Sequence, residues 1–493
     1  MATKPRSTAT VTALFVTVLL CASACGTQSG TAGTASTEAG SGHPGVYRVA
    51  ATLTGPITTG HVIEPLSANP TDLAAYGYVE QEFFASGTAS AFKATAAPGD
   101  GRWSIEPTTK AAYRTRILVR RPADPAHFNG TVVVEWMNVS AGESAPDWDY
   151  LNPELMRSGY AYVGVSAQAQ GVEGGKPILG SPVAGLSGGL VGSEPARYGT
   201  LHHPGDEYAL DMFAQIGKAL RSPGQAALGD LHPTHVVAVG ESQSAFYLTT
   251  FTDALQPLTH TFDGIFIHSR GGTGASLNGA SITSSQGTQG LRIRTDLDVP
   301  VFMFETQTDL VELGYAAAQQ PDTDRIRTWE VAGTSHADAF ELGPAADILG
   351  CTTPVNDGPQ HDVVQAAFAS FGRWVDDGTA PPSPPPFRLA STDPAVLALD
   401  SHGNVIGGVR TPAVDVPVST LSGAAPVGAS EICSLFGSTT AFSPETLASL
   451  YHTKGGYLAA YSASLDRAIK GRFILAADRA QLLAGAEEVQ IPA

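Results

Sequence analysis

One serine of this chain stands where its hydroxyl could become a nucleophile. Ser242 lies within Val236–Ala245, which begins as an apolar run and leads into a helical pattern. A buried strand, a sharp turn and a helix in this order predict a nucleophile elbow, whose usual pattern is G-x-S-x-G. Gly240 and Ser244 occupy the two outer positions, and both are small. An N-cap serine at the start of a helix would give the same local pattern.

A serine hydroxyl needs a histidine base and a carboxylate that orients the base. Asp309 follows the expected strand Val299–Phe304, and His336 follows the next expected strand, Arg325–Ala332. Consecutive parallel strands bring their carboxyl ends to one edge, so we expect Ser242, Asp309 and His336 to meet there. Taken singly, Asp309 could be a helix cap and His336 a loop residue. Glu305 is the alternative acid.

The developing negative charge of such a reaction needs two N–H donors. We expect one from the backbone of Gln243, the residue after the serine. The second is expected from the backbone of Met137 or Asn138, in the loop after the strand Thr131–Trp136. Glu241, next to the serine, is expected to be exposed and without a catalytic role.

Strands alternate with helices along the chain, which predicts an α/β fold with a mostly parallel sheet and helices on both faces. Residues 46–110 indicate only short strands and loops, and Gly271–Asp298 is the expected lid. The other expected elements are strands Tyr113–Arg121, Tyr160–Ala167 and Gly264–His268, helices Pro153–Ser158, Asp206–Leu220 and Asp362–Asp376, and a helix beginning at Ser443.

The first 25 residues have the pattern of a lipoprotein-type signal peptide. A basic start precedes the apolar stretch Val11–Leu20, which is short for a membrane span, and Ala22-Ser23-Ala24-Cys25 follows. We therefore expect export and acylation of Cys25, with ordinary cleavage as the alternative. Residues 26–45, rich in Gly, Ser and Thr, are expected to form a flexible tether.

Removal of the leader leaves two cysteines, Cys351 and Cys433. In an exported protein such a pair predicts one disulfide, although two buried thiols would also fit. Neither a CxxC nor an HExxH motif is present, and His202, His203 and Asp206 lack a third ligand at suitable spacing. We expect no metal and no cofactor.

The formal net charge of −18 argues against a nucleic-acid partner, which would require a basic face. With 43% hydrophobic and 15% charged residues, the chain has the composition of a folded globular protein. The Pro-rich stretch Pro381–Pro386 divides it into a main domain, residues 46–380, and a C-terminal extension, residues 381–493, expected to pack on that domain.

The chain resembles the α/β-hydrolase superfamily and, more closely, a family of exported bacterial proteins named for an alpha/beta hydrolase domain. The resemblance runs from about the end of the tether to the C-terminus. It rests on Phe128–Trp136, Arg197-Tyr198-Gly199, His203-Pro204-Gly205-Asp206 and Gly240–Ala245. It implies the fold and a Ser-His-Asp triad, and it implies no defined substrate. Ser244 in place of the last glycine of the elbow is a mild departure.

These observations together predict an exported, membrane-anchored serine hydrolase that acts on small-molecule carboxylic esters through an acyl-enzyme. The same triad would serve an amidase, a thioesterase or an acyltransferase. A non-catalytic envelope-binding lipoprotein on the same fold is the alternative from another class. The sequence gives neither the oligomeric state nor the acyl and alcohol groups of the substrate.

Overall fold

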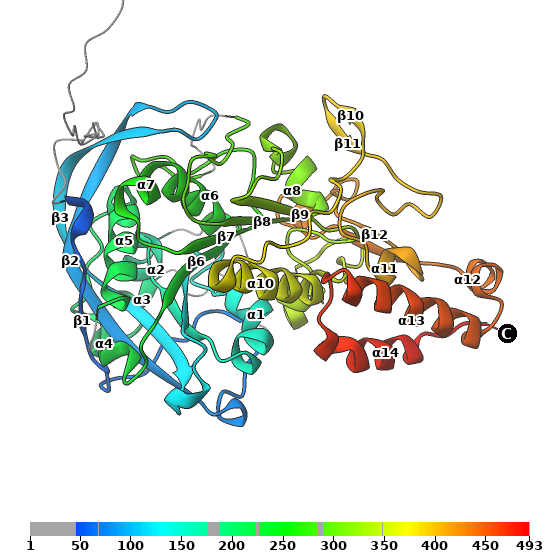
Figure 1. The fold of residues 1–493 in the computed structure, drawn as a ribbon, viewed down its shortest axis with the longest axis horizontal. Helices are drawn as coiled ribbons and strands as arrows, with labels where there is room; N and C mark the ends of the chain where they lie inside the picture. Colours follow the sequence, from blue (N-terminus) through cyan, green and yellow to red (C-terminus); the bar gives the residue numbers. More distant parts are fainter. Residues whose placement is uncertain are drawn as a thin grey trace, which may run out of the picture. The chain divides into compact units, whose positions relative to one another are not determined.

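One sheet of nine strands runs through the described part of the chain (Figure 1). The computed structural model describes residues 46–67, 69–175, 188–222, 226–282, 289–347 and 349–492. The predicted leader, Cys25 and the tether lie outside these ranges. Across the sheet the order is β1 (Thr52–Thr54), β2 (Tyr78–Ala96), β3 (Ser104–Pro122), β5 (Ala161–Val165), β4 (Thr131–Trp136), β6 (His235–Glu241), β7 (Gly264–His268), β8 (Val301–Glu305) and β9 (Ile326–Glu330).

The neighbouring strands β5, β4, β6, β7, β8 and β9 are parallel, as the alternation of strands and helices predicts. Every residue of β4, β5, β7 and β8 is buried. Strands buried on both faces have continuous apolar sequences, which is why these elements could be recognised. The expectation of an α/β fold with a mostly parallel sheet is confirmed.

The other edge of the sheet differs from the prediction. In place of short strands and loops, β2 and β3 form a long antiparallel hairpin of 19 residues each, and β3 pairs antiparallel with β5. The second half of β2 is rich in Ala, Ser and Gly, which are not the β-branched and aromatic residues typical of strands. Pairing between the two strands, with two register shifts, stabilises this half.

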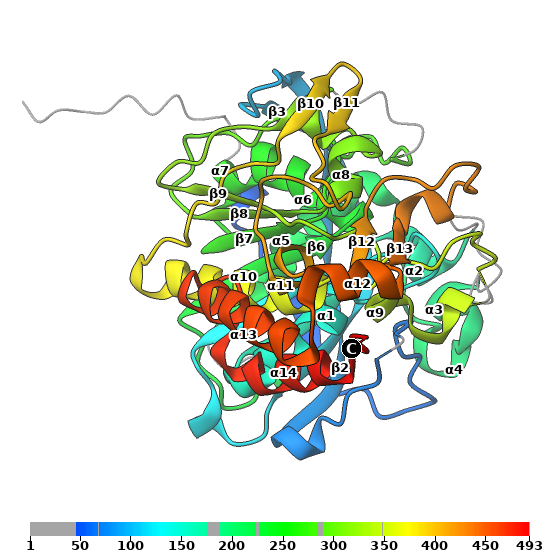
Figure 2. The same ribbon diagram turned by 90° about the vertical axis from the view of Figure 1, so that its right-hand side faces the viewer.

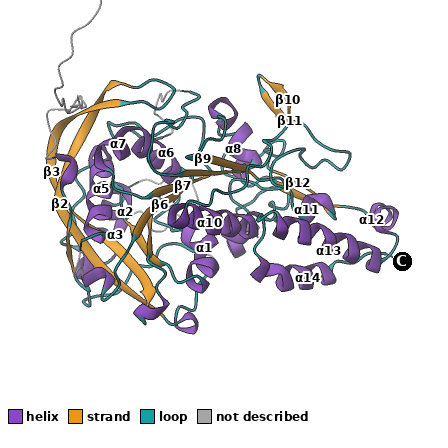
Figure 3. Cartoon of the chain, in the orientation of Figure 1, coloured by secondary structure: helices purple, strands orange, loops and turns teal. Residues whose placement is uncertain are grey.

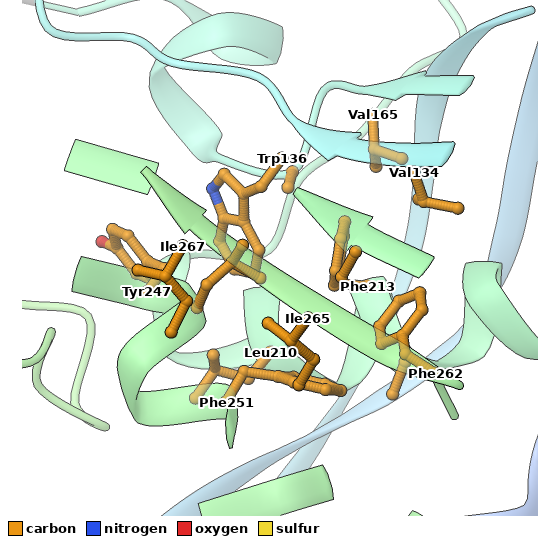
Figure 4. Packing of buried hydrophobic residues seen from close by; sticks show 14 of the residues in the cluster. Val134, Trp136, Val165, Leu210, Phe213, Tyr247, Phe251, Phe262, Ile265 and Ile267 are labelled. Atoms are coloured by element: carbon orange, nitrogen blue, oxygen red, sulfur yellow. The ribbon is translucent and has the colours of Figure 1, made fainter. Parts of the chain in front are cut away.

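Helices cover both faces of the sheet (Figure 3). On one face lie α5 and α6, and on the other lie α1 and α10. Trp136 of β4 packs between Phe213 of α5 and Tyr247 of α6, with ring centroids 5.0 and 4.8 Å away (Figure 4). The helices of the main domain are α1 (Pro146–Arg157), α2 (Ala169–Glu173), α3 (Gly189–Ser193), α4 (Pro195–Tyr198), α5 (Ala209–Leu220), α6 (Gln243–Thr250), α7 (Gln256–Thr259), α8 (Gln307–Val311), α9 (Ala339–Leu342) and α10 (Gln360–Asp377).

Helix α1 begins seven residues before the predicted Pro153. Its first turn is stabilised from the sheet, because the buried carboxylate of Glu135 accepts hydrogen bonds from the N–H groups of Asp147 and Trp148 at 3.1 and 2.9 Å. A proline is unfavourable inside a helix but is tolerated in the first turn, so a helix was expected to start at Pro153 and not before it. The buried cap explains why the helix nevertheless extends on both sides of that residue.

The chain beyond Pro386 packs on the sheet domain, and residues from Gly45 onward form one unit. The N–H of Val409 donates to Glu330 O, and Phe473 stacks edge-on to Trp329 of β9 at 5.0 Å. Figures 1 and 2 show α13 and α14 side by side. The elements of this part are β10 (Leu389–Thr392), β11 (Ala395–Leu397), α11 (Pro412–Asp415), β12 (Ser419–Ser422), β13 (Ser438–Ala441), α12 (Pro444–Tyr451), α13 (Lys454–Lys470) and α14 (Arg479–Glu488).

Helix α12 starts as predicted, with Ser443 as N-cap accepting a hydrogen bond from Thr446 N at 3.2 Å. None of the helices in the described ranges is both long enough and apolar enough to span a membrane.

Candidate active site

Ser242 occupies a sharp turn between β6 and α6. Its backbone has φ 57° and ψ −120°, a conformation that non-glycine residues rarely adopt. A Cβ placed on Gly240 would come within 3.1 Å of Ser244 Cβ and 3.0 Å of Leu248 Cδ1. The strand and the helix therefore pass each other as closely as an elbow requires, and Ser244 fits where glycine is usual.

The structure brings Ser242, His336 and Asp309 together at the carboxyl edge of the sheet. His336 Nε2 lies 2.7 Å from Ser242 Oγ, and His336 Nδ1 lies 2.6 Å from Asp309 Oδ1. The serine follows β6, the aspartate lies in the first turn of α8 after β8, and the histidine follows β9. A continuous chain of hydrogen bonds thus joins the three side chains that the sequence singled out.

Asp309 is held as an anion that can orient the imidazole. Its side chain is fully buried, and burial alone would raise the pKa of its carboxyl. The charge of His336 and the hydrogen bonds from His336 and Thr306 outweigh this effect, and they hold the pKa below its ordinary value. Thr306 donates to Asp309 Oδ2 from both its N–H, at 2.7 Å, and its hydroxyl, at 2.8 Å.

Glu305, the alternative acid, lies at the end of β8 and is also fully buried. Burial, and then the nearby charge of Asp309, raise the pKa of Glu305 well above its ordinary value. The carboxylate that bonds His336 Nδ1 is Asp309. The geometry therefore favours Asp309 over Glu305 as the acid of the site.

The expectation that Glu241 is exposed is wrong. Its residue is 3% exposed, its Oε1 lies 3.7 Å from His336 Nε2, and its Oε2 lies 3.4 Å from Asn138 Nδ2. Burial, and then the carboxyl groups of Glu341 and Asp147, raise its pKa well above the ordinary value. The loop after β4 covers this position, and no local sequence pattern reveals that long-range contact.

The two expected donors after β4 are not available through their backbone. The N–H of Met137 donates to Val165 O at 3.2 Å, and the N–H of Asn138 donates to Ser144 O at 2.9 Å. The side-chain amide of Asn138 does face the cavity beside Ser242, where its Nδ2 lies 3.3 Å from Glu241 O. In the described part of the chain no acceptor is found for the N–H of Gln243, the first residue of α6.

A cavity of about 380 Å³ opens onto Ser242 and His336. One wall comes from Leu66, the loop after β4 and the start of α1, and the other from residues 337–345, Leu349 and residues 432–436. The disulfide between Cys351 and Cys433 joins the two segments of the second wall. Sequence patterns did not identify these wall residues, because they lie in loops far apart in the chain.

The described residues of the expected lid, Gly271–Asp298, do not line this cavity, and residues 283–288 lie outside the described ranges. Gly274 instead lies against Thr250 and Leu291, beside α6. The cover over the site comes from the C-terminal segment and the loop after β9.

Among the described residues no cluster of His, Cys, Asp and Glu is arranged to hold a metal ion. His203 Nε2 donates to Ala167 O at 2.9 Å, and Asp206 accepts from the N–H of Ala169 at 2.7 Å. Both residues therefore stabilise the loop before α2.

The profile of a family described as an alpha/beta hydrolase domain matches residues 53–484, a span that includes all three residues of the site. The chain belongs to this family. The resemblance drawn from the sequence is confirmed. No curated protein matches this chain.

Among solved structures, similarity is found to the glucuronoyl esterase from Solibacter usitatus, with 11% identity over 58% of this chain and 85% of that one and a TM-score of 0.27. The esterase Est22 is similar at 10% identity over 53% and 75% of the two chains, with a TM-score of 0.29. The serine hydrolase XC6422 from Xanthomonas campestris is similar at 10% identity over 53% and 91%, with a TM-score of 0.26.

Proposed function

We propose that this alpha/beta hydrolase domain protein hydrolyses carboxylic esters through an acyl-enzyme on Ser242. The observation that carries the proposal is the hydrogen-bond chain from Ser242 Oγ through His336 to Asp309. A buried aspartate, an imidazole and a serine on a strained turn are what activation of a hydroxyl nucleophile requires. A protein that only binds ligands has no need of this arrangement.

The first half of the reaction forms the acyl-enzyme. Ser242 Oγ attacks the ester carbonyl carbon while His336 Nε2 takes the hydroxyl proton. The tetrahedral intermediate then collapses, the bond from carbon to the alcohol oxygen breaks, and His336 returns the proton to the departing alcohol. Asp309 keeps the proton of His336 on Nδ1, so that Nε2 faces the serine.

The second half releases the acid. Water attacks the acyl carbon while His336 Nε2 takes one of its protons. The bond to Ser242 Oγ then breaks, and the serine regains a proton from His336. In both halves the oxyanion accepts a hydrogen bond from the N–H of Gln243. The backbone N–H groups of Met137 and Asn138 already donate to Val165 O and Ser144 O, and the side-chain amide of Asn138 already donates to Glu241.

The test is hydrolysis of p-nitrophenyl esters by the mature protein, with Ser242→Ala beside Ser244→Ala. The two serines lie two residues apart in the sequence, and Ser244 is buried with no hydrogen-bond partner for its hydroxyl among the described residues. We expect Ser242→Ala to lower kcat by at least about 10³-fold, since loss of the nucleophile leaves only binding and oxyanion stabilisation. Ser244→Ala should keep its activity within severalfold. Equal activity of Ser242→Ala and the wild type would refute the proposal.

We also propose export and anchoring through an acyl chain on Cys25. The support is the pattern of the first 25 residues, a basic start, a short apolar stretch and small residues before the cysteine. Metabolic labelling with a radioactive fatty acid should label the wild type and not Cys25→Ser. Equal labelling of both would place the modification elsewhere.

A further inference from the structure

The cavity beside Ser242 is lined by acidic side chains and by no Lys or Arg among the described residues. Three carboxylic side chains line it, from Asp149, Glu241 and Glu341. The guanidinium of Arg120, whose charge acts on Asp149, does not line the cavity and pairs with Glu80 at 2.7 Å.

The rest of the cavity is mainly apolar. Leu66 and Pro146 lie on the first wall, and Leu342, Leu435 and Phe436 lie on the second. These side chains stabilise a bound group by removing its apolar surface from water. An aliphatic or aromatic group is therefore favoured next to the reacting carbonyl.

The carboxyl groups that line the cavity have raised pKa values. Burial raises the pKa of Asp149 to about 7. At Glu341, burial and then the charges of Asp338 and Asp149 raise the pKa to about 8. Tyr150 bridges the same group, with its hydroxyl donating to Asp338 Oδ1 at 3.0 Å and lying 3.3 Å from Glu341 Oε2.

A negative charge in this cavity would lose its water and gain no Lys or Arg partner from the described lining residues, and burial of an unpaired charge is strongly unfavourable. The same burial already disfavours the ionised form of the lining acids, so a negatively charged substrate group would be disfavoured there as well.

We propose that the site selects esters whose non-reacting part is apolar and carries no negative charge, with Glu341 as a specificity-determining residue. This rests on the proposed ester hydrolysis at Ser242. Esters that carry a carboxylate or phosphate near the scissile bond are excluded.

The experiment compares matched esters that differ by one charged group. On the acyl side, p-nitrophenyl hexanoate is paired with p-nitrophenyl monoadipate, in which a carboxylate replaces the terminal methyl. On the alcohol side, benzyl butyrate is paired with para-carboxybenzyl butyrate. In at least one pair the wild type should have a kcat/KM at least about 100-fold higher for the neutral ester, which equals about 2.7 kcal/mol.

Replacement of Glu341 by a lysine tests its role in substrate selection. Glu341→Lys should reduce that preference by about tenfold or more, and Glu341→Gln should reduce it less. Glu431→Lys is the matched control, because Glu431 is exposed, neighbours Ile432 of the wall and does not line the cavity. It should leave the preference unchanged. Thermal unfolding of each variant shows that it is folded.

Two results would overturn the inference. One leaves the proposed ester hydrolysis intact, and the other refutes it as well. If both neutral and anionic members of both pairs are hydrolysed within about threefold of each other, charge selection is refuted while ester hydrolysis stands. If folded wild type hydrolyses none of the four esters, the proposed function fails and the selection with it. An unchanged preference in Glu341→Lys would remove Glu341 from its role.

Discussion

The surroundings of Glu305 and Asp309, two acids four residues apart, shift their pKa values in opposite directions. Asp309 receives hydrogen bonds from His336 and Thr306 that hold it ionised, whereas burial raises the pKa of Glu305. We expect Asp309→Asn to lower kcat by roughly 10⁴-fold, because an amide would favour the wrong tautomer of His336. Glu305→Gln should change kcat little. Steady-state kinetics of the two variants check this, and the reverse ranking would make Glu305 the acid.

The same Glu305→Gln variant should change how stability depends on pH. The folded state keeps a proton on Glu305 that the unfolded chain releases above its ordinary pKa of 4.5. In the wild type this contribution to stability is therefore complete below that pH and is lost as pH rises towards the folded pKa. Glutamine does not ionise, so the variant should gain stability relative to the wild type as pH rises above 4.5. Urea unfolding at several pH values measures this, and parallel curves would contradict it.

At the scale of elements, continuous apolar runs made β4, β5, β6, β7 and β8 predictable, and Asp309 could be found because it follows such a strand. The elbow at Ser242 was predictable for the same reason. His336 could be found from its place after β9, whose sequence Ile-Arg-Thr-Trp-Glu is mixed. The hairpin β2–β3 was not predictable, because the second half of β2 is rich in Ala, Ser and Gly and depends on its pairing with β3. The burial of Glu241 and the bonded N–H groups of Met137 and Asn138 depend on how the loop after β4 folds over β6, which no local pattern encodes.

The disulfide between Cys351 and Cys433 connects the two segments that form one wall of the cavity. Its two cysteines lie 82 residues apart in the sequence, a long loop to constrain in the unfolded chain. Replacement of both by serine should cost about 2–5 kcal/mol of unfolding free energy, and it should raise KM more than it lowers kcat, since the wall binds substrate and the triad is held by the sheet. Denaturant unfolding and kinetics test both parts. An unchanged KM would show that the wall does not depend on the bridge.

At the scale of the whole molecule, the chain beyond Pro381 is part of the core. Glu330 of β9 accepts a hydrogen bond from the N–H of Phe387, and Leu465 of α13 is buried with residues of β8 and α10. Residues 432–436 also complete the cavity. We expect a chain that ends at Ala380 to expose the apolar surface of β9 and to aggregate when expressed. A soluble truncated protein with a cooperative unfolding transition would show that residues 46–380 fold independently.

The account depends most directly on Ser242 being an activated nucleophile. The decisive measurement is labelling of the mature protein with a fluorophosphonate probe, followed by mass-spectrometric mapping of the modified peptide, for the wild type, Ser242→Ala and Ser244→Ala. We predict labelling of the wild type and of Ser244→Ala on Ser242, and none of Ser242→Ala. An adduct on another residue, or a folded wild type that hydrolyses no ester and takes up no probe, would contradict the proposed function.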